Sequence, residues 1–213
     1  MTEYIKSNVQ LQILAAFIVM PLMIWAMGST PQRTLLKESL SVVTIISFSL
    51  MLGLFYLART NIFIVKKIRF SKLIGLHKFI GYAAVPLLLV HPFLLVVPRF
   101  FEAGVDPFDA FITIATTFTN KGVIFGLVAW SLLLIIGVTS IFRKNLPMKY
   151  QTWRIVHSVL AVLCAFFAVF HVIDLGRHID VAMTVFIVLL FVGAIYLLLK
   201  NYAENGQETG KQI

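Results

Sequence analysis

The stretch LHKFIGYAAVPLLLVH, residues 76–91, places two histidines in a segment that is otherwise mostly apolar. The stretch HSVLAVLCAFFAVFH, residues 157–171, repeats the same spacing between its first and last residues. Because each residue of an α-helix turns by about 100°, a step of about 14 residues falls about 40° short of four full turns. Each pair of histidines therefore shares one face of a helix, with about 21 Å between its members along the axis. The pairs are His77 with His91 and His157 with His171.

The composition around these stretches indicates an integral membrane protein. The 213 residues are 60% hydrophobic and 13% charged, whereas soluble domains carry about 25% charged residues. A helix crosses a bilayer with about 20 apolar residues, and six stretches of the sequence qualify. We therefore expect an all-α protein with a bundle of six transmembrane helices, forming one domain over residues 1–213. The expected helices span about residues 9–27, 40–58, 73–97, 122–142, 155–173 and 181–199.

The two ends of the chain allow further expectations. The first apolar stretch is longer than the core of a secretory signal, and GSTPQR follows it instead of an Ala-x-Ala cleavage site. We therefore interpret it as a retained transmembrane helix. The polar segment NYAENGQETGKQI at the C-terminal end is expected to be frayed.

The distribution of basic residues predicts the orientation in the membrane. The formal net charge is +9, but the cations occupy short gaps between apolar stretches, where they set topology instead of binding nucleic acid. Two gaps, 59–72 and 143–154, are the most basic. We expect these gaps and both termini to be cytoplasmic, in the cell inner (plasma) membrane. The cations are Arg59, Lys66, Lys67, Arg69 and Lys72 in the first gap, and Arg143, Lys144, Lys149 and Arg154 in the second.

In this orientation, the two histidine-bearing helices run in the same direction and present their histidines at matched depths. His77 and His157 lie near the cytoplasmic face, and His91 and His171 lie nearer the outer face. Polar side chains at membrane depth are costly and usually functional. Zinc requires three or four protein ligands, whereas a haem iron requires only two axial ones. The spacing therefore predicts two stacked haem b groups, each ligated by two histidines.

The remaining residues of the histidine faces are consistent with haem. A single cysteine, Cys164, excludes a CxxCH attachment and an intrachain disulfide. Small residues between the ligands would leave a slot for each porphyrin, although close helix packing is an alternative use for them. Cations near the ligands would bind haem propionates or simply extend to the membrane surface. The predicted lining residues are Gly81, Ala84, Ala161 and Ala168, whereas Cys164 is interpreted as a small core residue. The predicted propionate partners are Lys78, Arg143 and Arg154 at the inner level and Arg99 and Arg177 at the outer.

Two features lie in the expected outer loops. The gap 98–121 contains apolar residues with helical periodicity, which predicts a short amphipathic helix lying in the membrane interface. Capping of the outer site or contact with a partner are alternatives for it. The fifth histidine, His178, falls outside the repeated spacing, and we interpret it as a solvated loop residue. The periodic residues are Phe108, Phe111, Ile112, Ala115 and Phe118.

The histidine-bearing segments resemble the ferric reductase-like transmembrane domain. The resemblance is carried by LHKFIGYAAVPLLLVHPF at 76–93 and by TSIFRKNLPMKYQTWRIVHSVLAVLCAFFAVFH at 139–171. That superfamily includes ferric-chelate reductases, NADPH oxidases and the haem subunit of bacterial methionine sulfoxide reductases. The resemblance implies that the four histidines ligate two haems and that electrons cross from the cytoplasm to the outer side.

Two departures from the superfamily affect this interpretation. Ferric reductases and NADPH oxidases usually continue into a flavin- and nicotinamide-binding region, and we expect no such domain in this chain, which has no GxGxxG turn after a strand. The haem subunit of methionine sulfoxide reductases also lacks a flavin domain, but it usually lacks the histidine that stands here as His77. The complete set of four histidines favours a general two-haem member.

We therefore expect the haem-carrying membrane component of an oxidoreductase. The donor would be a cytoplasmic flavin reductase, with FAD or FMN on that separate protein, or a membrane quinol. The acceptor would be ferric iron, oxygen or a partner redox protein on the outer side. A methionine sulfoxide reductase-type subunit is one alternative. Another is a small non-redox transporter with a histidine proton relay, which would place carboxylates within its helices; the six predicted segments contain none.

Overall fold

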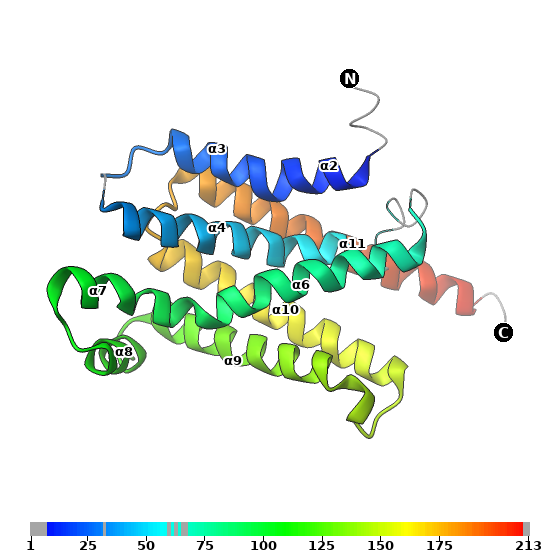
Figure 1. The fold of residues 1–213 in the computed structure, drawn as a ribbon. Helices are drawn as coiled ribbons and strands as arrows, with labels where there is room; N and C mark the ends of the chain where they lie inside the picture. The colour runs from blue at the N-terminus through cyan, green and yellow to red at the C-terminus, as the bar shows by residue number, and fades with distance from the viewer. Residues whose placement is uncertain (1–7, 32, 59–60, 62–63, 65–67, 211–213) are drawn as a thin grey trace. The chain divides into compact units, whose positions relative to one another are not determined.

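The structure is a computed structural model that describes residues 8–31, 33–58, 61, 64 and 68–210, with side chains as far as residue 200. In these ranges all the regular structure is helical, and six helical segments are long and apolar enough to cross a membrane (Figure 1). The prediction of an all-α protein with six transmembrane helices is therefore confirmed. Arg59, Lys66 and Lys67 lie outside the described residues.

The helices follow one another with short connections. The first span, Val9–Met27, is formed by three consecutive elements, of which the middle one is π-helical. This element ends two residues before Pro21, whose ring nitrogen cannot donate a backbone hydrogen bond. The elements are α2 (Val9–Leu14), η1 (Ala15–Val19), α3 (Met20–Met27), α4 (Leu35–Tyr56), α6 (Phe70–Leu94), α7 (Val96–Ala103), α8 (Pro107–Ala115), α9 (Lys121–Ile141), η2 (Arg143–Asn145), α10 (Tyr150–Leu175) and α11 (Val181–Gly210).

Several helices extend beyond their predicted ends. Helix α4 begins at Leu35 instead of residue 40, because its charged first turn is satisfied by partners elsewhere: Lys37 pairs with Glu102, and Glu38 with Arg33. The six predicted segments contained no carboxylate, but the longer observed helices do contain some, such as Glu38 in the first turn of α4. These carboxylates lie near the helix ends. The C-terminal segment expected to fray instead continues α11 as far as Gly210.

A short helix is present where the sequence predicted one, as α8 (Figure 1). The Asp106 side chain caps it by accepting hydrogen bonds from the backbone N–H groups of Phe108 and Asp109, as expected of an N-cap residue. The helix ends at Ala115, so Phe118 lies beyond it. The ring of Phe111 stacks on Phe93 of α6 at 4.8 Å between centroids.

The chain divides into two compact units. The first contains the described residues of 1–29, 45–84 and 180–213, and the second contains 30–44 and 85–179. In the first unit, the hydroxyl of Tyr56 donates to the backbone oxygen of Leu190 at 2.8 Å, which ties α4 to α11. Its buried apolar cluster comes from α2, η1, the end of α4 and α6: Val9, Ile13, Phe17, Leu57, Leu73 and Ile80.

The second unit is organised around the packing of α9 against α10, which run side by side (Figure 1). Small buried residues lie between the two helices and let the backbones approach closely, as is common in membrane proteins. The Cys164 thiol reaches the backbone oxygen of Ala129 at 3.4 Å. Cys164 is buried in this packing, which confirms its interpretation as a small core residue. The indole nitrogen of Trp130 donates to Leu89 at 2.8 Å and joins α9 to α6.

Candidate functional site

Two of the four spaced histidines donate to backbone oxygens. The Nδ1 atom of His77 lies 3.2 Å from the Leu54 oxygen near the end of α4. The Nδ1 atom of His171 lies 2.8 Å from the Gly122 oxygen in the first turn of α9. A carbonyl oxygen can only accept a hydrogen bond, so Nδ1 carries the hydrogen in both rings. The Nε2 atom of each neutral ring then keeps its lone pair.

The other two histidines are bonded to hydroxyl groups. The Nδ1 atom of His91 lies 3.4 Å from Thr44 Oγ1, and that of His157 lies 3.3 Å from Ser140 Oγ. Each hydroxyl donates its own hydrogen to the backbone oxygen four residues earlier in its helix, at 2.8 and 2.6 Å. The hydroxyl oxygens are thus left to accept from Nδ1. These two rings therefore have the same tautomer as the first two.

The four histidines share a form that is suited to binding a metal. A ligating histidine usually donates one ring N–H to the protein and binds the metal through its other nitrogen. All four side chains are half-buried. Within the described part of the chain, no protein atom bonds the Nε2 of His77, His91 or His171. The chain therefore presents Nε2 lone pairs at membrane depth.

The number of ligands that come together is small. Among the described residues, no group of three or more His, Cys, Asp or Glu side chains could hold a metal ion. His91 and His171, both in the second unit, are close enough to interact electrostatically. His157 lies in the same unit, whereas His77 lies in the first. Pairs of ligands match the axial requirement of haem iron and fall short of that of a zinc site.

A glycine makes room for the ring of His171. A Cβ atom at Gly126 of α9 would lie 2.5 Å from Nδ1 and 2.7 Å from Cε1 of His171. One turn earlier, a Cβ at Gly122 would collide with Asp174 and Leu175 of α10. Neither glycine was predicted from the sequence to be part of the site. Their four-residue spacing, GVIFG at 122–126, resembles the GxxxG pattern of close helix contacts and could have revealed them.

An aromatic stack leads from the end of α9 and α10 to His157. The guanidinium of Arg143 lies 4.1 Å from the centroid of Tyr150 and 5.3 Å from that of Trp153. The ring of Tyr150 stacks on Trp153 at 6.0 Å, and Trp153 lies 5.0 Å from the His157 ring. The indole Nε1 of Trp153 is buried and has no hydrogen-bond partner among the described residues. A buried donor beside a possible ligand indicates a missing acceptor.

The other residues predicted for the site are distributed as follows. Gly81 faces open space, since a Cβ there would meet no atom within 4 Å. Ala84 is fully buried in the first unit, whereas Ala161 and Ala168 are half-buried. Lys78, Arg99 and Arg154 are exposed. The guanidinium of Arg177 donates to the backbone oxygen of Pro31 at 3.0 Å.

The interpretation of His178 as a solvated loop residue is wrong, since its side chain is buried. Its Nε2 lies 2.9 Å from a carboxylate oxygen of Glu38, and its Nδ1 lies 2.9 Å from Thr30 Oγ1. Arg33 bonds Glu38 and Ser41 in the same cluster, at 2.9 and 2.7 Å. Burial lowers the pKa of His178, and Glu38 opposes this shift. The partners are more than a hundred residues away in sequence, so local patterns could not reveal them.

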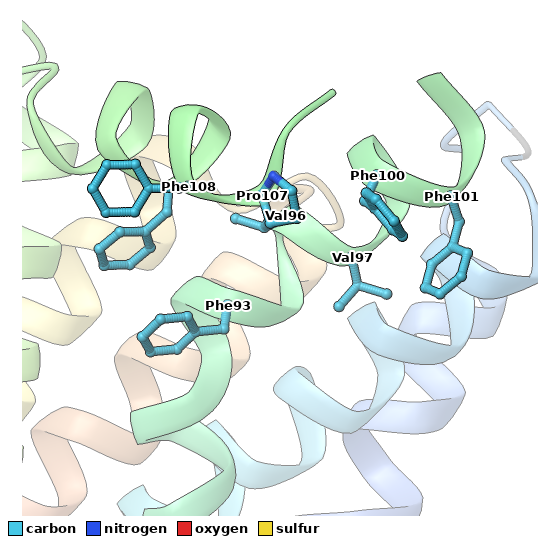
Figure 2. A pocket seen from close by; sticks show the side chains of 8 residues that line it. Phe93, Val96, Val97, Phe100, Phe101, Pro107 and Phe108 are labelled. Atoms are coloured by element: carbon cyan, nitrogen blue, oxygen red, sulfur yellow. The ribbon is translucent and has the colours of Figure 1, made fainter. Parts of the chain in front are cut away.

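An apolar groove of about 410 Å³ lies where α6, α7 and α8 meet. Figure 2 shows the aromatic side chains that surround it, and its lining consists of five phenylalanines, two valines and a proline. The groove contains no side chain that could donate to a ligand. It suits hydrocarbon, as a groove would if α8 lay in the membrane interface.

Comparisons with known proteins identify related sequences. The family described as "Ferric reductase like transmembrane component" matches residues 43–173, a range that includes the four spaced histidines. A protein of Archaeoglobus fulgidus, described as an uncharacterized protein, is 41% identical over 160 residues, which cover 75% of this chain and 87% of the relative. No solved structure matches the chain.

Proposed function

Because the chain belongs to the ferric reductase-like transmembrane family, we propose that it carries electrons across a membrane through two bis-histidine b haems. The family suggests transmembrane electron transfer, and its members generally bind haem. His77 and His157 would ligate the inner haem, and His91 and His171 the outer one. The chain would thus be the haem-carrying membrane component of an oxidoreductase.

The observation that carries the proposal is the common tautomer of the four histidines. Each Nδ1–H is directed to an oxygen of a neighbouring helix, and in the described part of the chain no protein atom bonds the Nε2 of His77, His91 or His171. Such a hydrogen bond fixes the orientation of the ring and raises its basicity as a ligand. A proton relay would not require four identical tautomers. The transporter alternative is therefore less well supported than haem ligation.

The surrounding residues suit a haem at each level. At the inner level, the unpaired Nε1 of Trp153 would donate to a propionate, with Lys78, Arg143 and Arg154 as further cationic partners. At the outer level, Gly126 admits the His171 ring. Gly81, Ala84, Ala161 and Ala168 are proposed to face the porphyrins. A bound haem b supplies a one-electron iron couple, while the chain supplies ligation, burial and hydrogen bonds that set its potential.

The direction of transfer follows from the positive-inside rule. The basic turn around Lys144 and Lys149 would lie on the cytoplasmic side, together with both termini, in the cell inner membrane. The donor would be a cytoplasmic flavin reductase that holds FAD or FMN, or a membrane quinol. The acceptor would be ferric iron, oxygen or a redox protein outside. A methionine sulfoxide reductase-type role remains the second redox assignment, and the presence of His77 favours the general two-haem form.

Haem quantification tests the proposal directly. The protein is produced with adequate haem supply, purified in detergent and assayed as the pyridine haemochrome. We expect about two b haems per chain and the spectrum of low-spin, bis-histidine iron. A colourless preparation that is still folded would contradict the proposal. A single haem per chain would contradict the two-level arrangement and leave only one histidine pair as ligands.

A further inference from the structure

We propose that the turn joining α9 to α10 is the docking face for an acidic, flavin-carrying electron-donor protein. This inference rests on the proposed function and deepens it, because it assigns a surface and a chemistry to the donor. The surface, here called the basic turn, comprises Arg143, Lys144, Lys149, Tyr150 and Arg154, with Pro147 and Met148 at its centre. All of its side chains are exposed.

Among the described residues, no carboxylate neutralises the charge of the basic turn. Arg143 and Arg154 are also proposed partners of haem propionates, so Lys144 and Lys149 are the two cations that serve only the docking face. Residues 143–154, RKNLPMKYQTWR, contain four cations and no Asp or Glu. In the described part of the protein, none of these four cations forms an ion pair with a carboxylate. An uncompensated patch of one sign accelerates and orients the approach of a partner of opposite sign. The partner should therefore carry carboxylates around its redox cofactor.

The centre of the basic turn is apolar and its rim is charged. Met148 is 42% exposed and Tyr150 is 47% exposed, and Pro147 lies beside them. Apolar side chains surrounded by polar ones are the usual anatomy of a protein–protein interface. Arg143 lies over the Tyr150 ring, so this ring is held in place before a partner arrives. Preorganised side chains lower the entropic cost of docking.

The aromatic stack connects this face to a proposed haem ligand. Tyr150, which is exposed, stacks on Trp153, and Trp153 lies 5.0 Å from the His157 ring. A protein docked over Tyr150 is therefore two aromatic rings away from the inner ligand. Anionic lipid headgroups would also be attracted to the cations. Binding of lipid headgroups would not require aromatic rings that lead to a proposed haem ligand. The stack therefore favours a redox protein over lipid as the partner of the basic turn.

A binding measurement tests the surface without depending on haem. The full chain is placed in nanodiscs of phosphatidylcholine, and binding of oxidised flavodoxin, an acidic flavoprotein used as the probe, is followed by interferometry. We expect saturable binding that weakens as salt rises from about 20 mM to about 500 mM. The variant Lys144→Glu/Lys149→Glu should weaken binding at low salt by a factor of about ten or more. Both lysines are exposed, and neither belongs to the proposed haem site.

Single variants supply a matched control. Lys149→Glu and Lys121→Glu make the same charge change, but Lys121 is an exposed residue at the opposite end of α9. Only Lys149→Glu should weaken binding of the probe. Equal effects of the two variants, binding unaffected by the double variant, or no charge-dependent binding at all would each overturn the proposal. If the probe shows no charge-dependent binding but the basic turn binds phosphatidylglycerol vesicles, the basic turn is a lipid-binding surface.

These measurements distinguish failure of the docking face from failure of the proposed two-haem function. Interferometry reports the docking face whether or not the chain holds haem, because the probe is oxidised and no electron moves. The haemochrome assay reports haem regardless of docking. Haem in the chain without charge-dependent binding refutes the docking face alone. Charge-dependent binding to a chain without haem refutes the proposed function and, with it, the identification of the partner as an electron donor.

Discussion

The Nδ1 atom of His171 on α10 lies 2.8 Å from the backbone oxygen of Gly122 on α9, and four residues later Gly126 leaves space for the same ring. The first contact selects the tautomer, because the carbonyl accepts only from a protonated nitrogen. The second sets the position of the ring, since no other residue type would fit. Together they direct Nε2 away from α9, as a ligand requires.

Removing a proposed ligand should remove one haem. The His171→Ala variant is expected to retain about one haem per chain, because a low-spin site requires both axial ligands. The pyridine haemochrome assay and the chain concentration give this ratio. His178→Ala is the matched control, since His178 bonds Glu38 and Thr30 and has no predicted role in ligation. An unchanged haem content in His171→Ala would exclude His171 as a ligand.

Adding one methyl group at Gly126 should displace a ligand. The Cβ of Gly126→Ala would lie 2.5 Å from His171 Nδ1, a separation that real contacts do not allow. We expect loss of the outer haem or a high-spin signal in its electron paramagnetic resonance spectrum. Gly137→Ala in the same helix places its Cβ 3.6 Å from Val85 and should leave the spectrum unchanged. Equal spectra for both variants would contradict the close contact.

Removing the hydroxyl that accepts from His91 should weaken the outer site without deleting a ligand. Thr44→Val removes the acceptor for Nδ1–H, so haem affinity should fall by about 10- to 100-fold. Transfer of haem to apomyoglobin measures this loss. Thr139→Val makes the same change at a threonine whose hydroxyl bonds only its own helix. Transfer at the same rate from both variants would indicate that the bond to His91 has no role.

The unpaired indole nitrogen can be tested by a change that keeps the ring stack. Trp153→Phe removes Nε1 but retains an aromatic ring beside His157. A hydrogen bond to a charged group contributes about 1.5–3 kcal/mol, so loss of the inner haem should accelerate about tenfold or more. Trp130→Phe is the control, because Trp130 already donates to Leu89. That variant should lower thermal stability and leave haem loss unaffected.

The buried cluster around His178 predicts a dependence of stability on pH. Burial lowers the pKa of His178 from its ordinary value of 6.5; Glu38 opposes this effect, and Arg33 and Arg177 add to it. The unfolded chain then binds a proton more readily than the folded one. Stability should be fully present above pH 6.5 and should decrease as the pH falls toward the pKa of the folded state.

Thermal melting in detergent measures this effect. The melting temperature of the wild type should decrease as the pH is lowered from about 8 to about 5, and the decrease should be smaller in His178→Gln. Glutamine retains a polar side chain of similar length but does not titrate in this range. Identical slopes for wild type and variant would assign the pH dependence to other groups and show that His178 does not carry it.

Much of the architecture could be predicted because membrane helices are specified locally. Length and apolar composition identify a span, so the helix expected over 122–142 appears as Lys121–Ile141. The errors occur where a distant partner satisfies a charge. Lys37 and Glu38 indicated a loop, yet their distant partners Glu102 and His178 allow α4 to begin before them.

The sequence alone determined the membrane class, the six helical spans and the two histidine pairs of equal spacing, because each of these depends on residues that are neighbours along one helix. Only the tertiary structure decided which ring nitrogen of His171 bonds α9, that Gly126 accommodates this ring, that Cys164 packs against α9, and that His178 is buried beside Glu38. Each of these is a contact made through tertiary packing. The periodicity of one helix does not specify which atoms of another part of the chain lie opposite it.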